Sequence, residues 1–339
     1  MGRIQVGILG MGRLGASIGL ALKRAVKSNP RQEFIITGYD SSGENAAAAQ
    51  KRGALDATAG SPAEAAAEKE IVVLALPYAD VREGYRQIGG AIKEGAVILD
   101  FSPLALPSME WRKQFVKPGA HLVALTAVLN PNYLFDGLDD LEHAAEDLFD
   151  KGAMLLMPAP DAVKEAVELA SDFSEIIGAA ARFADPYEHD GWIAAMEGLP
   201  AVLGVAAFYG LQAADGWSDA RRAGNPNFGR LTHHLADSHP DDLRDLLLNN
   251  REATVRQIDM TIHTLSALRG AIAANDRAAL EEALIASRDA YAVWLSQRRR
   301  ADWGDVPAKP ENESVGDIWM SSLLGGYLAK RLRGRGGDE

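Results

Sequence analysis

The sequence predicts an α/β protein with a Rossmann-type, doubly wound and mostly parallel sheet, followed by an all-α helical domain. Three observations support this fold class: short apolar runs alternate with helical patterns through the first half, a glycine-rich turn joins the first run to the first helix, and no strand pattern follows Asp185-Pro186. Strands that alternate with helices are typical of βαβ units. We therefore expect a dinucleotide-binding domain over 1–185, a helical domain over 186–333 and a disordered tail over 334–339.

The first half is predicted to form alternating strands and helices. Apolar runs bounded by turn residues predict strands at Ile4–Leu9, Phe34–Tyr39, Ile71–Leu76, Ala96–Leu99, Leu122–Leu125, Ala153–Met157 and Ala181–Phe183. Apolar residues spaced near 3.6 predict helices at Leu14–Lys27, Glu44–Arg52, Val81–Ile92 and Ala162–Ile177. A further helix is expected to begin after Ser61, the N-cap, with Pro62 at its first position and Glu64 completing a capping box.

The second half is predicted to be helical. Long helical patterns cover His189–Leu211, Leu243–Ala274, Ala278–Arg299 and Ile318–Leu332. Asn275-Asp276 marks the turn between the second and third of these, with Asp276 as a natural N-cap. We expect Asp302–Ser314 to be a polar connection to the last helix, and the sequence shows no internal repeat.

The composition excludes several classes of function. The 339 residues are 47% hydrophobic and 24% charged, which is typical of a soluble globular protein. A net charge of −12 argues against a general nucleic-acid binder, which needs a basic face. Because the chain has no cysteine, disulfides, thiolate catalysis and cysteine-ligated zinc are excluded, and no metal site is predicted.

The sequence also predicts a cytoplasmic protein without a membrane partner. Met1-Gly2-Arg3 runs directly into the first strand, so no signal peptide is expected. We find no run of about 18 apolar residues that lacks a charge or a helix breaker. The best candidate, Val315–Leu332, contains Asp317 and Lys330, and we expect it to be a docked helix.

A dinucleotide fingerprint follows the first strand. Gly10, Met11, Gly12, Arg13, Leu14 and Gly15 form a G-x-G-x-x-G sequence that opens the first helix. Gly10 allows a tight turn, Gly12 lets the backbone approach a pyrophosphate, and Gly15 lets the helix pack closely on the strand. The N-terminus of the helix then offers N–H groups and a positive dipole end to the phosphates.

The second strand supplies the expected ribose ligand. Asp40 ends that strand, 25 positions after Gly15, and its carboxylate is expected to accept hydrogen bonds from the adenosine ribose. This carboxylate favours NAD over NADP because it repels a 2′-phosphate, although Arg13, Ser41 and Ser42 offer groups that hold a phosphate. Leu76, the last residue of the predicted strand Ile71–Leu76, and Pro77, directly after it, are expected either to line the dinucleotide crevice or simply to end the strand.

Segments in both halves resemble the prephenate/arogenate dehydrogenase family, the oxidoreductases of tyrosine biosynthesis. In the first half the resemblance rests on Gly10–Lys23, Gly38-Tyr39-Asp40, Val72–Pro77, Val97–Asp100 and Val116–Ala120. In the second half it rests on the more specific pieces Asp185–Asp190, Leu199-Pro200, Leu243-Arg244-Asp245 and Asn250–Ala253. The resemblance implies a Rossmann domain joined to a helical dimerisation domain, a homodimer, and oxidative decarboxylation of a cyclohexadienyl substrate.

Four segments depart from what the family has on its substrate side. Pro103 and Ala105 stand where the family has a serine and a lysine, with Ser102 one place early. Thr126-Ala127-Val128 aligns with the family's His-Pro-Met, whose histidine is the proposed base. Its Leu-Pro-His becomes Leu199-Pro200-Ala201, and its Thr-Arg pair becomes His233-His234. We therefore expect weak or absent turnover of prephenate.

The candidate catalytic residues follow from this comparison. Removing a hydride from an alcohol carbon needs a base for the hydroxyl proton. We name His189, Ser102, Thr126 and His234 as candidates, with His233, His239 and Asn130 as further possibilities. Arg221, Arg222 and Arg230, in a Gly/Asn/Pro-rich loop over 220–229 and directly after it, either bind a substrate carboxylate or cover the surface.

Three functions remain open at this point. The first is an NAD(P)-dependent dehydrogenase of the prephenate/arogenate type, acting on prephenate or on a related carboxylated substrate. The second is a dinucleotide-binding regulatory or structural protein that has lost its chemistry. The third is an imine or ketone reductase on the same scaffold.

Overall fold

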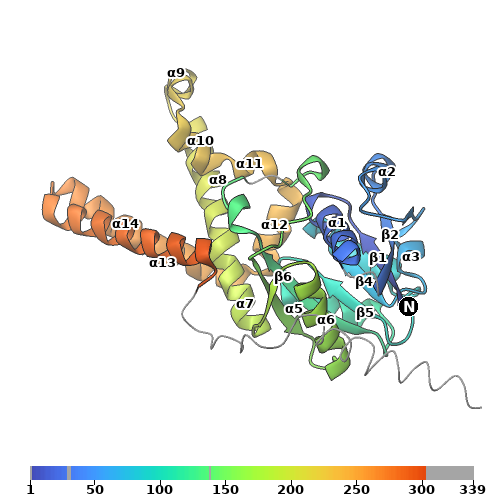
Figure 1. The fold of residues 1–339 in the computed structure, drawn as a ribbon. Coiled ribbons are helices and arrows are strands. Elements are labelled where there is room, and N and C mark those ends of the chain that lie inside the picture. Colours follow the sequence, from blue (N-terminus) through green and yellow to red (C-terminus); the bar gives the residue numbers. More distant parts are fainter. Residues whose placement is uncertain (1, 29–31, 137–138, 303–339) are drawn as a thin grey trace, which may run out of the picture. The chain divides into compact units, whose positions relative to one another are not determined.

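The computed structural model describes residues 2–28, 32–136 and 139–302, which form two compact units (Figure 1). The first unit extends to Ala184 and the second spans Asp185–Asp302. The predicted helix at Ile318–Leu332, most of the predicted connection over Asp302–Ser314 and the predicted tail over 334–339 lie outside the described residues.

The first unit is built on a sheet that confirms the predicted fold class. Its elements, in chain order, are β1 (Gly2–Leu9), α1 (Arg13–Ser28), β2 (Gln32–Tyr39), α2 (Gly43–Lys51), β3 (Ala57–Thr58), α3 (Pro62–Ala66), β4 (Ile71–Leu74), α4 (Tyr78–Ile88), β5 (Val97–Asp100), α5 (Ala105–Phe115), β6 (His121–Val128), β7 (Ala153–Pro158), α6 (Lys164–Ile176) and β8 (Ala180–Phe183). In the described residues the strand order is β3-β2-β1-β4-β5-β6-β7-β8. All neighbours are parallel except β6 and β7.

The strand order creates a switch point beside β1. The chain leaves β1 toward β2 and β3 and then returns to its other side at β4. Ligands of doubly wound sheets bind outside the carboxyl ends of the strands at such a point. Alternate residues of a strand face opposite layers: Val6 joins a core shared with α1 and α6, whereas a Cβ on Gly7 would lie 2.1 Å from the carbonyl oxygen of Ala65 in α3.

Some predicted boundaries in the first unit were wrong. Helix α5 was not predicted; it carries Pro107 in its first turn, where proline costs no helical hydrogen bond. The predicted strand Ile71–Leu76 ends at Leu74, and all four of its residues are buried, as expected. Ser61 caps α3 through Glu64 N–H, but the Glu64 carboxylate accepts from Gly60 N–H rather than completing the predicted capping box.

The second unit contains only helices among its described residues. They are α7 (Pro186–Ile193), a π-helical turn (Ala194–Gly198), α8 (Leu199–Gln212), α9 (Trp217–Ala220), a 3₁₀ turn (Arg221–Ala223), α10 (Pro226–Thr232), α11 (His234–Asp237), α12 (Pro240–Asn249), α13 (Arg251–Ala273) and α14 (Arg277–Arg300). Helices α13 and α14 form a long hairpin (Figure 1). As predicted, Asp276 caps α14 by accepting from Ala279 N–H at 3.1 Å.

Three helical predictions in this unit were too simple. The stretch His189–Leu211 is divided by the π-helical turn. The stretch Leu243–Ala274 is two helices that separate at Asn250, whose side-chain amide donates to Asp190 O at 2.6 Å. The predicted loop over 220–229 contains a 3₁₀ turn and the start of α10.

The sequence predicted no membrane span, but one stretch of the described residues is long and apolar enough to cross a membrane. Among the described residues, Pro186–Gln212 passes by length and composition, with a mean hydropathy of 1.5 in its most apolar window, of which 28% is buried. The earlier candidate, Val315–Leu332, lies outside the described residues. A core or interface helix passes the same test, and this stretch contains Glu197 and the π-helical turn.

Candidate dinucleotide site

Two glycines of the fingerprint are required by the packing of the chain itself. Gly10 has φ +92°, and a Cβ there would lie 2.1 Å from Ala75 O. A Cβ on Gly15 would lie 1.9 Å from Gly10 O. These close approaches bring the end of β1, the start of α1 and the segment after β4 together at the switch point.

Gly12 differs from its two neighbours in the motif. A Cβ on Gly12 would meet only Asp139 O, at 3.4 Å, which is an ordinary van der Waals distance. The internal packing therefore does not require glycine at this position. A ligand that approaches the backbone here supplies the missing reason, so the turn fits the pyrophosphate of a dinucleotide.

Asp40 lies at the end of β2 with its carboxylate turned toward the glycine-rich turn. One oxygen accepts from Met11 N–H at 2.7 Å and the other from Ser42 N–H at 2.8 Å. The side chain is half-buried. Ser42 is occupied as the N-cap of α2, and Ser41 is exposed. Asp40 thus lies where the ribose ligand of a Rossmann domain is expected.

The other fingerprint residues have packing roles. Met11 is fully buried and lies in the core on the α1 face. Leu14 is half-buried and packs against the same core. Leu76 is half-buried, whereas Pro77 is exposed and directly precedes α4. The segment after β4 passes close to Gly10, because a Cβ on Gly10 would lie 3.0 Å from Leu76 N.

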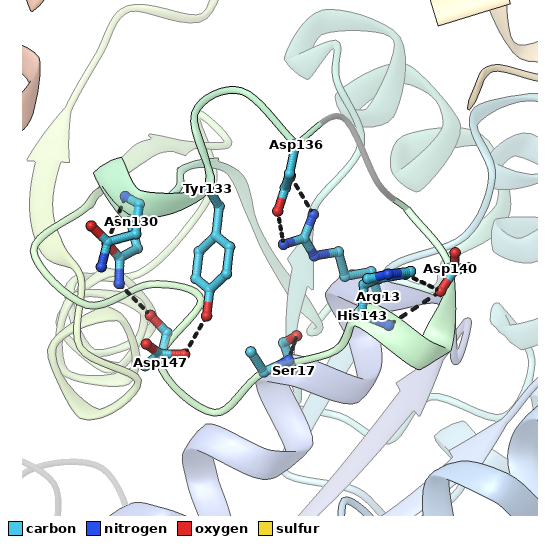
Figure 2. A network of polar contacts seen from close by, with 10 residues as sticks. Arg13, Ser17, Asn130, Tyr133, Asp136, Asp140, His143 and Asp147 are labelled. Atoms are coloured by element: carbon cyan, nitrogen blue, oxygen red, sulfur yellow. Dashed lines mark hydrogen bonds and ion pairs between the residues drawn. The ribbon is translucent and has the colours of Figure 1, made fainter. Parts of the chain in front are cut away.

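Arg13 has partners that the sequence did not predict. Its guanidinium forms a two-pronged ion pair with Asp136, both N–O distances being 2.8 Å, and lies 5.0 Å from the centroid of the Tyr133 ring (Figure 2). Its backbone N–H donates to Asp139 O at 3.1 Å. The Arg13 side chain is only 4% exposed, and hydrogen bonding to Asp136 raises its pKa. The acidic run around residues 136–140 was the available sequence signal, but no motif linked it to α1.

Ser102 belongs to a buried polar cluster at the end of β5. Its hydroxyl donates to Asp100 Oδ1 at 2.5 Å, its N–H donates to the same oxygen at 2.8 Å, and Tyr85 donates to Asp100 Oδ2 at 2.6 Å. Burial raises the pKa of the Asp100 carboxyl, although these hydrogen bonds act in the opposite direction. The Ser102 hydroxyl is therefore directed into the protein.

The remaining candidates of the first unit are Thr126, which is half-buried, and Asn130, which is buried. Thr126 lies on β6 opposite Leu155 and is half-buried. Asn130 caps the short turn Pro131–Tyr133 by accepting from Asn132 N–H, and its amide donates to Asp147 O (Figure 2). The side chain of Asn130 is thus hydrogen-bonded to two residues of the connection between β6 and β7, in which it lies.

The histidine candidates lie in the second unit. His189 is fully buried in α7, and its Nδ1 lies 2.9 Å from Asp190 Oδ1. Asn250 holds the backbone of the same Asp190, so this contact joins α7 to the start of α13. The His234 ring donates through Nε2 to Ala201 O at 3.0 Å and packs against Gly204, where a Cβ would be 2.0 Å from the ring.

Two further histidines and three arginines of this unit lie at its surface. His233 is exposed, 3.6 Å from Asp237, and His239 accepts Asp241 N–H as the N-cap of α12. Arg221, Arg222 and Arg230 are also exposed, and the first two donate to Ser218 O and Asp219 Oδ1 of their own segment. Ser102 and Thr126 belong to one unit and His189 and His234 to the other.

Two family models match the chain, one in each half. Residues 5–103 match "NADP oxidoreductase coenzyme F420-dependent", and residues 185–286 match "Prephenate dehydrogenase, dimerization domain". The prephenate dehydrogenase of Bacillus subtilis (strain 168) is 26% identical over 321 residues, which cover 89% of this chain and 78% of that protein.

Solved structures show the same fold. The prephenate dehydrogenase of Aquifex aeolicus, in complex with hydroxyphenyl propionate and NAD+, matches with a TM-score of 0.74 and 21% identity, over 86% of this chain and 98% of that one. The arogenate dehydrogenase of Synechocystis matches with a TM-score of 0.65 and 17% identity, over 85% of this chain and 100% of that one.

Proposed function

We propose, because the chain belongs to the prephenate/arogenate dehydrogenase family, that it is an NAD(P)-dependent dehydrogenase that oxidises a small carboxylated substrate. The observation that carries this proposal is the glycine-rich turn between β1 and α1. Gly12 in that turn has no packing reason to be glycine, and Asp40 lies beside the turn at the end of β2.

The proposed cofactor is NAD rather than NADP. The half-buried Asp40 carboxylate suits two ribose hydroxyls and repels a 2′-phosphate. The cofactor residues are Gly10, Met11, Gly12, Arg13, Leu14, Gly15, Asp40, Leu76 and Pro77. A dinucleotide held by these residues would supply a hydride acceptor for the oxidation. The A. aeolicus relative with NAD+ supports the assignment.

The substrate proposal is a carboxylated compound of the prephenate type, with prephenate itself a poor substrate. Thr126 has no proton affinity near neutral pH, and a missing general base typically costs about 10²–10⁴ in rate. His234, in place of arginine, is shorter and is bonded to Ala201 O. His189 remains a candidate base, but its burial and its bond to Asp190 favour a positioning role.

The proposed setting is a cytoplasmic homodimer that serves tyrosine biosynthesis and has no nucleic-acid or membrane partner. The helical unit exposes many large apolar side chains, and its matching family model is a dimerisation domain. The net charge of −12 supports the absence of a nucleic-acid partner.

One set of observations favours a second function, a dinucleotide-binding protein without dehydrogenase chemistry. The Ser102 hydroxyl is bonded to Asp100 and the buried His189 ring to Asp190, so two candidate groups are already engaged. A substrate screen separates the two functions. NAD and NADP reduction is followed with prephenate, arogenate and a panel of hydroxy acids. Turnover of any of them supports the dehydrogenase, whereas cofactor binding without turnover supports the second function.

A further inference from the structure

The connection between β6 and β7 forms hydrogen bonds and ion pairs with α1 and with the C-cap of α2. At the N-terminus of α1, Arg13 pairs with Asp136; one turn later, Ser17 Oγ accepts from Ala145 N–H at 3.0 Å (Figure 2). Further along α1, Arg24 forms a second two-pronged pair with Asp150, at 2.8 and 2.6 Å. From the C-cap of α2, the Arg52 guanidinium donates to three carbonyl oxygens of the connection, those of Leu141, Glu142 and Ala144.

Two contacts of Arg13 with this connection use groups that a bound phosphate needs. The Arg13 N–H, which donates to Asp139 O, lies at the first position of α1, where Rossmann domains present donors to pyrophosphate. The guanidinium of the same residue donates to both oxygens of Asp136. A guanidinium fork binds carboxylate and phosphate with the same two-pronged geometry, so Asp136 occupies Arg13 in the way a phosphate would.

The charge of Asp136 and the position of Asp139 O also indicate that these residues compete with a bound phosphate. The Asp136 carboxylate is an anion held by the side chain of the first residue of α1, the helix whose positive end attracts the negative charge of a pyrophosphate. Asp139 O is the atom nearest to the space above Gly12. A dinucleotide in this turn therefore approaches the carbonyl oxygen that accepts from the Arg13 N–H.

We propose that Asp136 and a phosphate group of the dinucleotide are alternative partners of Arg13, so that the cofactor binds by exchanging this ion pair. Asp136 acts as an intramolecular competitor that sets cofactor affinity, and Arg13 is a phosphate-binding residue. This inference rests on the proposed function, because it needs a dinucleotide in the glycine-rich turn. The phosphate is either the pyrophosphate or the 2′-phosphate of NADP.

The test is a set of variants titrated with NADH, NADPH and ADP-ribose by calorimetry. Asp136→Asn keeps the size of the side chain but removes its charge. We expect the dissociation constants of the dinucleotides to fall roughly tenfold, because the carboxylate no longer competes with the phosphate for Arg13. An equal gain for NADH and NADPH assigns Arg13 to the pyrophosphate, and a gain confined to NADPH assigns it to the 2′-phosphate. Asp150→Asn is the matched control: it breaks the same kind of pair on the same helix and leaves affinity within about twofold.

A double-mutant cycle separates exchange from simple repulsion. Exchange requires Arg13, so Asp136→Asn gives no gain when Arg13 is already Gln. An undiminished gain in the Arg13→Gln background overturns the proposal, because the effect is then repulsion by Asp136 alone. Unchanged or weaker binding by Asp136→Asn, with a thermal midpoint like that of Asp150→Asn, overturns it as well and leaves the proposed function intact. If neither wild type nor any variant binds a dinucleotide, both proposals fail.

Discussion

At the scale of single residues, the three fingerprint glycines have different reasons to be glycine. Gly10 and Gly15 allow backbone atoms to approach where a Cβ would lie about 2 Å from a carbonyl oxygen. Gly12 is in ordinary contact distance of its only neighbour. Substitutions at these positions therefore affect different properties of the protein.

We expect Gly12→Val to abolish NAD binding while the protein keeps most of its stability, because the branched side chain fills the space that the pyrophosphate needs. Gly15→Ala is expected to lower the free energy of unfolding, because the start of α1 must move away from Gly10 O. Calorimetric titration with NAD and urea denaturation measure the two effects. Unchanged NAD binding by Gly12→Val contradicts the assignment of the site.

A second prediction concerns Ser102, whose hydroxyl is directed at the buried Asp100. Removing one partner of a buried polar group costs about 1–3 kcal/mol, so Ser102→Ala is expected to lower the free energy of unfolding by this amount. NAD affinity should stay unchanged. Tyr85→Phe, which removes the donor to the other Asp100 oxygen, is a matched variant. Full stability of Ser102→Ala, together with a loss of turnover, favours a catalytic hydroxyl instead.

At the scale of elements, the sequence predicted those that have a strong local pattern. The strand at β4 is apolar throughout, and the motif that opens α1 has three glycines at fixed spacing, so both were found. Helix α5 was missed because Pro107 suggests a break. The break at Asn250 depends on a contact with Asp190, 60 positions away, which periodicity does not encode.

In the candidate site, too, the sequence located the residues of a local motif but not the contacts between distant segments. The cofactor residues follow one another in a local motif, so spacing alone located them. The contacts of Arg13 with Asp136 and Asp139 join segments 123 and 126 positions apart. Both partners lie outside any helix or strand. Contacts between residues so far apart in the sequence are visible only in the folded structure.

The hairpin of α13 and α14 gives a prediction at this scale. Asp276 is the N-cap of α14, and losing such a cap typically costs about 1 kcal/mol. We expect Asp276→Ala to lower the free energy of unfolding by this amount in urea denaturation. Asp289→Ala removes an exposed carboxylate that pairs only with its neighbour Arg288, so it should have almost no effect. Equal stability of the two variants argues against a capping role for Asp276.

At the scale of the whole molecule, the two units differ in what they expose. The helical unit has large apolar side chains at its surface on several helices, among them Tyr209, Met260, Ile262, Leu265, Ile272, Leu284 and Val293, each more than half exposed. Exposed apolar surface of this kind marks an interaction site. The most apolar window of Pro186–Gln212 is also largely uncovered, and a partner helix would cover it as well as a lipid would.

We therefore predict a homodimer formed through the helical unit, since two-fold dimers are the commonest closed assembly. Multi-angle light scattering at micromolar concentration should give twice the mass of one chain. Leu265→Glu combined with Val293→Glu places charges on the exposed faces of α13 and α14, and we expect this variant to have the mass of a monomer and to remain helical. Val163→Glu, an exposed apolar position of the first unit, is the control and should remain a dimer. A wild-type protein with the mass of one chain contradicts the prediction, and the exposed side chains of α13 and α14 then need a different partner.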